Sequence, residues 1–191
     1  MTVDHSSTEC IVTDPKAAKR AYDRARYLRR RAERDADRPA DPISVIDEPT
    51  AAYLAGLTDG DGSIYVTRTN RLRTVYPAVS WAMTHKPTIE WVGSILGLGA
   101  VVHNNHTNLR TGETTWGRSS FKVQWRVSVA GTRAVLLCRR MLPYLRTKRE
   151  QAELVLQFPA DERRAPGVRL SEEVRARRIE LGDAISKLNR G

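Results

Sequence analysis

The chain of 191 residues has few cysteines, few aromatic residues and no long apolar run. Two cysteines, Cys10 and Cys138, are too few for a disulfide scaffold or a four-cysteine zinc site. No stretch reaches the roughly 18 uncharged apolar residues that a membrane-spanning helix needs. The first ten residues, MTVDHSSTEC, lack the basic-then-apolar pattern of a secretory signal. We therefore expect a globular protein that is neither secreted nor inserted in a membrane.

Acidic residues are scarce in the middle of the chain, and this is where the positive charge gathers. Residues 1–50 hold 10 basic and 10 acidic side chains, and residues 151–191 hold 8 and 7. Residues 51–150 hold 14 basic and 5 acidic side chains, a net charge of +9 out of +10 for the whole chain. Such a bias favours a polyanionic partner, because basic side chains that neutralise phosphates release counterions. A well-solvated surface is the alternative interpretation.

The first 49 residues are predicted to form a basic helical arm and an acidic linker. Asp14 and Pro15 are a typical helix start, an N-cap followed by proline at the first helical position. Residues 16–34 hold 9 basic and 2 acidic side chains over an apolar stripe that is mostly alanine, so an arm on nucleic acid and a solvated helix are equally compatible. Residues 35–50 carry three prolines and five acids, a composition typical of a linker.

Residues 50–191 are predicted to form one α+β domain with an antiparallel sheet. A helix rich in small residues covers 51–62, and strands at 62–69 and 74–83 form a hairpin through 70–73. A helix from Pro87, a strand at 100–106 and a strand at 121–129 follow. Helices at 131–142, 146–158 and about 171–188 complete the order αββαββα plus further helices.

The predicted strands divide into an apolar and a polar face, because successive side chains point to opposite sides of a sheet. Ile64, Val79, Trp81, Trp125 and Val127 belong to the apolar face, which we expect helices to cover. The polar face has no acid, and such side chains suit base edges and phosphates in a DNA groove, although a plain exposed face is the simpler alternative. Its predicted DNA-binding residues are Tyr65, Thr67, Thr69, Arg71, Arg73, Tyr76, Ser80, Lys122, Gln124, Arg126 and Ser128. Pro77 lacks an N–H and requires an edge or a bulge within the second strand.

The segment from Leu54 to Gly62, LAGLTDGDG, resembles the LAGLIDADG motif of homing endonucleases, with Thr58 at its fifth place and Gly60 at its seventh. The resemblance is closer still to the type found in algal chloroplast introns, which carries one motif per chain and works as a homodimer. Thr84-His85-Lys86, the glycines near 97–99 and Pro143-Tyr144-Leu145 with the following helix agree in order and spacing. The resemblance covers about residues 51–190 and implies the LAGLIDADG homing-endonuclease fold, a saddle-shaped antiparallel sheet with helices on one face.

The motif also has a physical interpretation of its own. Ala55 and Gly56 are small enough for two copies of this helix to approach closely across a dyad, and a chain with one motif needs a second chain for that. Tight packing within one chain is the alternative, but it would leave the carboxylates at the helix end unexplained. Two Asp61 carboxylates near a dyad favour a divalent cation between them, and hard oxygen ligands suit Mg²⁺.

The resemblance implies a role for each matching residue. Asp61 is then the metal-binding catalytic acid, Gly60 adds a backbone ligand, Lys148 stabilises the scissile phosphate or organises water, and His85 positions water. Ala55, Gly56 and Asp59 form the dimer interface, Asp59 being chiefly structural. The cofactor implied is Mg²⁺, with Mn²⁺ as a substitute. Ile89 departs from the type, which has a basic residue there.

These features predict a homodimeric, metal-dependent, site-specific endonuclease that cuts a long pseudo-palindromic double-stranded DNA target. Its location is then the cytoplasm, or the organelle or nucleoid that holds the target DNA. Two alternatives remain open: a DNA-binding regulator of the same fold that does not cleave, and a maturase that aids splicing of its intron RNA. Retention of Asp59 and Asp61 counts against the first, and the basic segment 16–34 leaves intron RNA open as an added partner.

Overall fold

A computed structural model describes residues 14–36, 39–69, 74–98, 102–104, 124–159 and 170–190. These residues fall into two compact units. The first contains helix α1 (Pro15–Ala36), which begins where the sequence predicts, since the Lys16 amide donates to the Asp14 carboxylate at 2.9 Å. The second contains every described residue from Ala40 onward. None of the described helices is long and apolar enough to cross a membrane.

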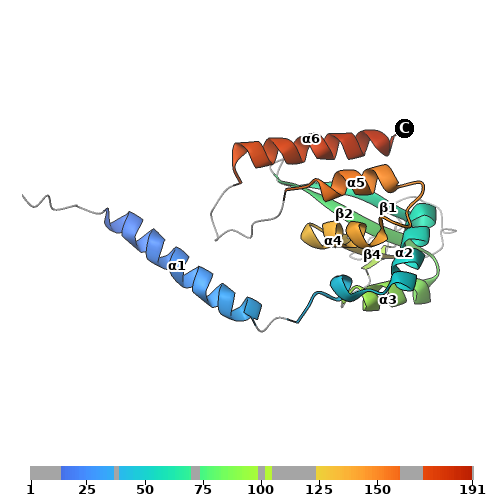
Figure 1. Ribbon diagram of the computed structural model, residues 1–191, viewed down its shortest axis with the longest axis horizontal. Coiled ribbons are helices and arrows are strands. Elements are labelled where there is room, and N and C mark those ends of the chain that lie inside the picture. The colour runs from blue at the N-terminus through green and yellow to red at the C-terminus, as the bar shows by residue number, and fades with distance from the viewer. Residues whose placement is uncertain are drawn as a thin grey trace, which may run out of the picture. The chain divides into compact units, whose positions relative to one another are not determined.

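The second unit follows the predicted order of elements (Figure 1). Its helices and strands are, in chain order, η1 (Pro42–Val45), α2 (Glu48–Asp61), β1 (Gly62–Thr69), β2 (Thr74–Met83), α3 (Lys86–Ile95), β3 (Val102–Asn104), β4 (Gln124–Ala130), α4 (Thr132–Met141), α5 (Arg149–Leu156) and α6 (Glu172–Leu188). The predicted hairpin turn at 70–73 and the start of the strand at 121–123 lie outside the described residues.

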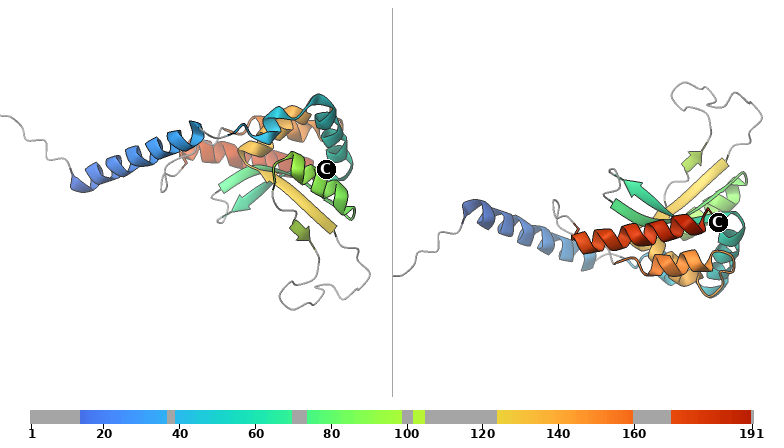
Figure 2. Two further views of the ribbon diagram at one scale, coloured as in Figure 1. Left: turned by 90° about the horizontal axis from the view of Figure 1, so that it is seen from below. Right: turned by 90° about the horizontal axis from the view of Figure 1, so that it is seen from above.

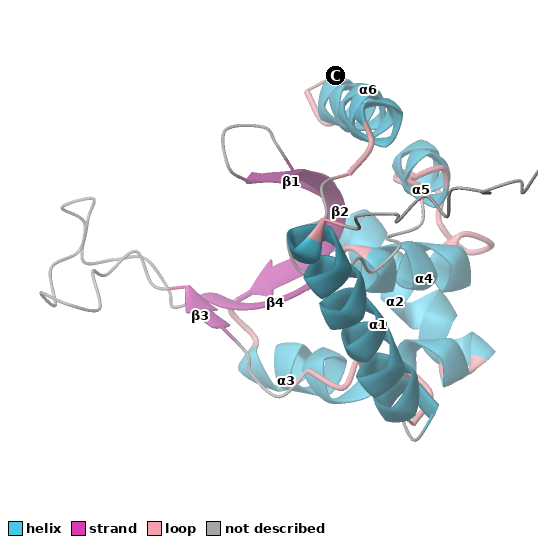
Figure 3. Ribbon diagram, turned by 90° about the vertical axis from the view of Figure 1, so that its left-hand side faces the viewer, coloured by secondary structure: helices cyan, strands magenta, loops and turns pink. Residues whose placement is uncertain are grey.

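The four strands form one antiparallel sheet in the order β1-β2-β4-β3, as predicted for an α+β fold. Helices α2 to α6 all contact strands and lie on one side of the sheet (Figures 2 and 3). The register confirms the predicted separation of faces: Ile64 pairs with Val79, and Val79 with Val129, all buried under the helices. Tyr65, Tyr76 and Arg126 occupy the alternate positions, on the opposite face.

Two glycines of the second unit let helices approach the sheet closely. A Cβ on Gly62, the first residue of β1, would lie 2.6 Å from Thr58 Cα and 2.9 Å from Trp81 Nε1. A Cβ on Gly182 of α6 would lie 2.8 Å from a methyl group of Val75. These close approaches join the end of α2 to the sheet and press α6 against it.

Pro77 lies where the ladder between β2 and β4 has ended. That ladder begins at the pair Ala78–Ala130, and the Pro77 carbonyl accepts the Gly131 amide at 2.8 Å. In an antiparallel strand the N and C=O of a residue face the same neighbour, so the missing donor of Pro77 faces the end of β4. The sequence-based requirement for an edge position is therefore met within a central strand.

The predicted linker at 35–50 is wrong for its second half. Asp41 caps η1 by accepting the Ile43 amide at 3.1 Å, and Asp47 caps α2 by accepting the Thr50 amide at 3.1 Å. Ile43 is 0% and Ile46 5% exposed, so both belong to the core. Composition suggests a linker because it counts three prolines and five acids together, whereas two of the prolines and two of the acids begin or cap η1 and α2.

Candidate active site and nucleic-acid interface

The motif helix α2 ends at the sheet, and Thr58 fixes this junction. The Thr58 hydroxyl donates to the Leu54 carbonyl at 2.6 Å and accepts the indole N–H of Trp81 at 3.1 Å. Both side chains are 0% exposed. Buried donors need partners, so a threonine at the fifth place of the motif satisfies a tryptophan in β2. This pair could not be predicted from the sequence, because nothing in the spacing links position 58 to position 81.

Asp59 binds the loop that precedes α5. Its carboxylate accepts the amides of Arg146 at 2.7 Å and Lys148 at 3.0 Å and the hydroxyl of Thr147 at 2.9 Å. Partial burial alone would raise the pKa of Asp59, but these hydrogen bonds outweigh it and hold the pKa below its ordinary value of 3.8. The ionised Asp59 carboxylate thus joins the end of α2 to the start of α5 through hydrogen bonds.

The side chain of Lys148 adds two further hydrogen bonds between the start of α5 and the end of α2. The ammonium donates to the Thr58 carbonyl at 2.7 Å and to the Asp59 carbonyl at 2.8 Å, two of the last carbonyls of α2. A cation at a helix C-terminus is favoured by the orphan carbonyls and by the helix dipole. The structure therefore brings Lys148 to the end of α2 that carries Asp61, where its ammonium caps the helix.

Asp61 differs from Asp59 in its surroundings. It is the last residue of α2 and is exposed, and within the described part of the chain its carboxylate accepts no hydrogen bond. Two carboxylates two residues apart thus have different functions, because one is used by the fold and the other is left to solvent. The described residues contain no group of three His, Cys, Asp or Glu side chains that would hold a metal by themselves.

His85 is the N-cap residue of α3. Its Nδ1 is 2.7 Å from the Thr88 hydroxyl, and the side chain is exposed. It lines a cavity of about 490 Å³ together with Pro49, Thr50 and Tyr53, which belong to the first half of α2 rather than to its Asp61 end. Ile89, one turn further on, is 0% exposed and part of the core, so this position of the chain supplies no charge to the surface.

The predicted dimer-interface residues differ from one another in exposure. Ala55 is 0% exposed and belongs to the core of its own chain, so its assignment to a surface is wrong. Gly56 is exposed and has open space around it, since a Cβ there would meet nothing within 4 Å; the same holds for Gly60, the predicted metal ligand. The sequence therefore predicts that a small residue of α2 is exposed, but not which one. Adjacent residues of a helix point in directions 100° apart, and only the fold decides which of the two faces outward.

The polar face of the sheet is organised around Arg126. Its guanidinium donates to the Tyr65 hydroxyl and to the Ser80 hydroxyl, each at 3.2 Å, and stands 5.9 Å from the Tyr65 ring centroid. Ser80 is 5% exposed beneath it, so its predicted DNA contact is not available in this structure and its hydroxyl orients Arg126 instead. Gln124 and Ser128 are exposed, and Thr67, Thr69 and Tyr76 are partly exposed. Arg71, Arg73 and Lys122 lie outside the described residues.

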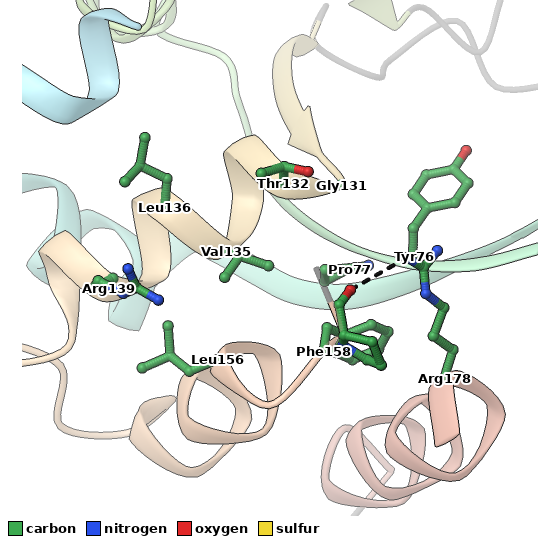
Figure 4. A pocket seen from close by; sticks show the side chains of 11 residues that line it. Tyr76, Pro77, Gly131, Thr132, Val135, Leu136, Arg139, Leu156, Phe158 and Arg178 are labelled. Atoms are coloured by element: carbon green, nitrogen blue, oxygen red, sulfur yellow. Dashed lines mark hydrogen bonds between the residues drawn. The ribbon is translucent and has the colours of Figure 1, made fainter. Parts of the chain in front are cut away.

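A separate cavity of about 260 Å³ lies on the helix side of the sheet (Figure 4). Its lining is mainly apolar and includes Val135 and Leu136 of α4, Leu156 of α5 and Phe158, which follows α5. Tyr76 belongs to the lining, yet its ring points away from Phe158 and Arg178, consistent with its register on the polar face. The cavity contains no other predicted site residue.

Comparison with known proteins agrees with the motif. No family model matches the chain. The chain is 33% identical over 124 residues to the DNA endonuclease I-CvuI of Chlorella vulgaris, a match that covers 61% of this chain and 68% of that protein. The crystal structure of the homing endonuclease I-CvuI in complex with its target in the presence of Ca is similar at a TM-score of 0.55 and 26% identity, covering 75% of this chain and 84% of that one.

A second structure of I-CvuI, with the I-CreI target and Mg and with the DNA not cleaved, matches equally well, at a TM-score of 0.55 over 75% of this chain and 84% of that one. The antiparallel sheet with helices on one side and the motif at the end of α2 define the class of this protein as a homing endonuclease. The chain belongs to the LAGLIDADG homing endonuclease family.

Proposed function

We propose that this chain is a homodimeric, divalent-metal-dependent endonuclease that cuts a specific double-stranded DNA site. The observation that carries the proposal is the contrast between Asp59 and Asp61. Asp59 has both carboxylate oxygens bound by its own chain, whereas Asp61 is presented to solvent at the end of the same helix. A carboxylate without protein partners at the end of a motif helix is available to a cation.

The polar sheet face supports DNA as the substrate. Its described residues are uncharged or basic, and the guanidinium of Arg126 is held by two hydroxyl groups, so that little conformational entropy is lost when it binds. An oriented guanidinium suits bidentate hydrogen bonds to guanine O6 and N7 in the major groove. Two such faces related by a dyad read a pseudo-palindromic sequence. I-CvuI has been crystallised with DNA targets, which is compatible with this substrate class.

The donors at the α2 end fit Mg²⁺. Asp61 and the Gly60 carbonyl supply hard oxygen ligands, and Mg²⁺ commonly binds one or two carboxylates while keeping several waters and substrate phosphates. When bound, the metal supplies an activated water and relief of charge at the leaving oxygen. In this chain Lys148 adds positive charge beside the site while it holds the α2 carbonyls in place. The second carboxylate comes from the partner copy of α2.

The experiment is cleavage of a random duplex library with Mg²⁺ and sequencing of the ends. We expect wild type to yield one family of pseudo-palindromic sites. Asp61→Asn keeps the side-chain size, so it should bind the selected site with nearly unchanged affinity and cut it immeasurably slowly. Glu173→Gln, an exposed carboxylate in the first turn of α6, is the matched control and should cut normally. Full cleavage by Asp61→Asn would refute the catalytic assignment.

The same library separates the competing functions. Binding of wild type to duplex DNA with no cleavage at any metal concentration would indicate a regulator of this fold. The dimer is tested by sedimentation at micromolar concentration, where wild type should be dimeric. Gly56→Leu should be monomeric, because a bulky side chain on the exposed side of α2 would hold two such helices apart. A monomeric wild type would refute the two-chain site.

A further inference from the structure

Helix α1 is long, positively charged and unused by the function proposed so far. It has 22 residues, hence a length of about 33 Å at 1.5 Å per residue. Of its side chains that the structure describes, all are exposed except those of Tyr27 and Arg31, which are half-buried. Most helices in proteins are stabilised by packing of an apolar face, so a helix this exposed needs another reason for its sequence.

The charges of α1 gather on one side. The helix holds 9 basic and 3 acidic residues, a net charge of +6. At 3.6 residues per turn, seven of the eight basic positions between Lys16 and Arg31 fall within an arc of about 160°. The seven are Lys16, Lys19, Arg20, Arg24, Arg26, Arg30 and Arg31. These cations form a row about 23 Å long at 1.5 Å per residue, which matches the negative charge along a duplex backbone.

The opposite side of α1 excludes other partners. It consists mainly of alanines at 17, 18, 21, 25 and 32, and its two large side chains, Tyr22 and Leu28, are six residues apart and so do not lie one above the other on the helix. Helices that lie on membranes or in protein grooves present large apolar side chains every three to four residues along one face. Alanine buries too little surface for either, whereas phosphate binding needs no apolar face.

The fold fixes the point at which α1 is attached to the second unit. Arg133 of α4 forms an ion pair with the Asp41 carboxylate at 2.7 Å and also donates to the Leu96 carbonyl at the end of α3. Arg133 follows β4, whose last residue Ala130 is level with Tyr65 through Ala78. Gly62, which follows Asp61 in the chain, lies three residues before Tyr65 in β1. The attachment point is thus at the end of β4 that is farther from Asp61.

We propose that α1 binds the phosphate backbone of duplex DNA flanking the sequence read by the sheet. The five residues 37–41 allow it a reach of at most about 20 Å from η1, and the tether raises the effective concentration of the helix near bound DNA. A 33 Å helix along a duplex spans up to about ten base pairs. The inference rests on the proposed function only in that the second unit binds DNA.

The test is the salt dependence of binding to a 60-base-pair random-sequence duplex without divalent metal, measured by fluorescence anisotropy between 50 and 200 mM salt. Lys16→Gln, Arg20→Gln and Arg24→Gln are combined in the full chain. The slope of log K against log salt is negative, and each lost phosphate contact reduces its magnitude by about 0.9. We therefore expect the magnitude of the slope to fall by about 2 to 3 in this variant. Glutamine is a good helix former, and circular dichroism checks that helix content is unchanged.

The matched control removes the same charge elsewhere: Arg139→Gln, Arg175→Gln and Arg177→Gln lie on α4 and α6, away from the polar sheet face. It should retain the wild-type slope, and exchanging lysine for arginine and arginine for lysine at the three α1 positions should retain it too. An unchanged slope in the glutamine variant overturns the proposal. So does a loss confined to an RNA duplex of equal length, which would assign the arm to RNA. Cleavage by wild type with an unchanged slope in the variant would leave the proposed function intact.

Discussion

The hydrogen bond between Thr58 and Trp81 allows a sharp test of how the motif helix is attached to the sheet. Thr58→Val keeps the shape of the side chain and removes the hydroxyl that accepts the indole N–H at 3.1 Å. Both residues are fully buried, so water cannot replace the lost acceptor. An unsatisfied buried donor costs about 1–3 kcal/mol. In a domain of 150–250 residues each kcal/mol lowers Tm by about 2–4 °C, so we expect a decrease of roughly 2–12 °C.

The assay is thermal and urea unfolding of four proteins: wild type, Thr58→Val, Trp81→Phe and the double variant. Phenylalanine has no N–H to satisfy, so Thr58→Val should cost less than about 0.5 kcal/mol in the Trp81→Phe background. Thr58→Ser, which keeps the hydroxyl, should lose less stability than Thr58→Val. An equal loss from Thr58→Val in both backgrounds would refute the argument, since the penalty would then come from packing alone.

Three further predictions concern the same helix end and the core. The pKa of Asp59 is lowered, so its contribution to stability is complete above the unfolded pKa of 3.8 and is lost as pH falls through the lower folded value; the deficit of Asp59→Asn in urea unfolding should therefore be largest near neutral pH and shrink below pH 3.8, and a pH-independent deficit would contradict this. Gly62→Ala should destabilise the protein by about 1–3 kcal/mol because its Cβ would overlap Thr58 Cα, whereas Gly60→Ala, with open space around it, should be tolerated. Burial raises the pKa of Cys138 to about 12; in a Cys10→Ser background iodoacetamide at pH 8 should label the chain only after unfolding, and labelling of the folded protein would show that the core opens.

The elements of the second unit could be predicted because their signals are local. Period-two alternation identifies β1, β2 and β4, and parity assigns Ile64 and Trp81 to the core face, which the register confirms. The ordered residues 41–47 could not be predicted, because a short cap and a buried isoleucine have no periodicity to read. Proline and acid counts suggest a linker whether or not the prolines begin helices.

The sequence by itself determined the family, the motif and the sign of the charge on the sheet, since each depends on residue type and order. Tertiary structure alone decided what each motif residue faces. It placed Ala55 in the core and Gly56 outside, bound Asp59 to the 146–148 loop while leaving Asp61 exposed, and set Ser80 under Arg126. The physical reason is that burial and hydrogen bonding are set by groups distant in sequence: the partners of Asp59 lie 87 to 89 residues away, and no local pattern encodes that meeting.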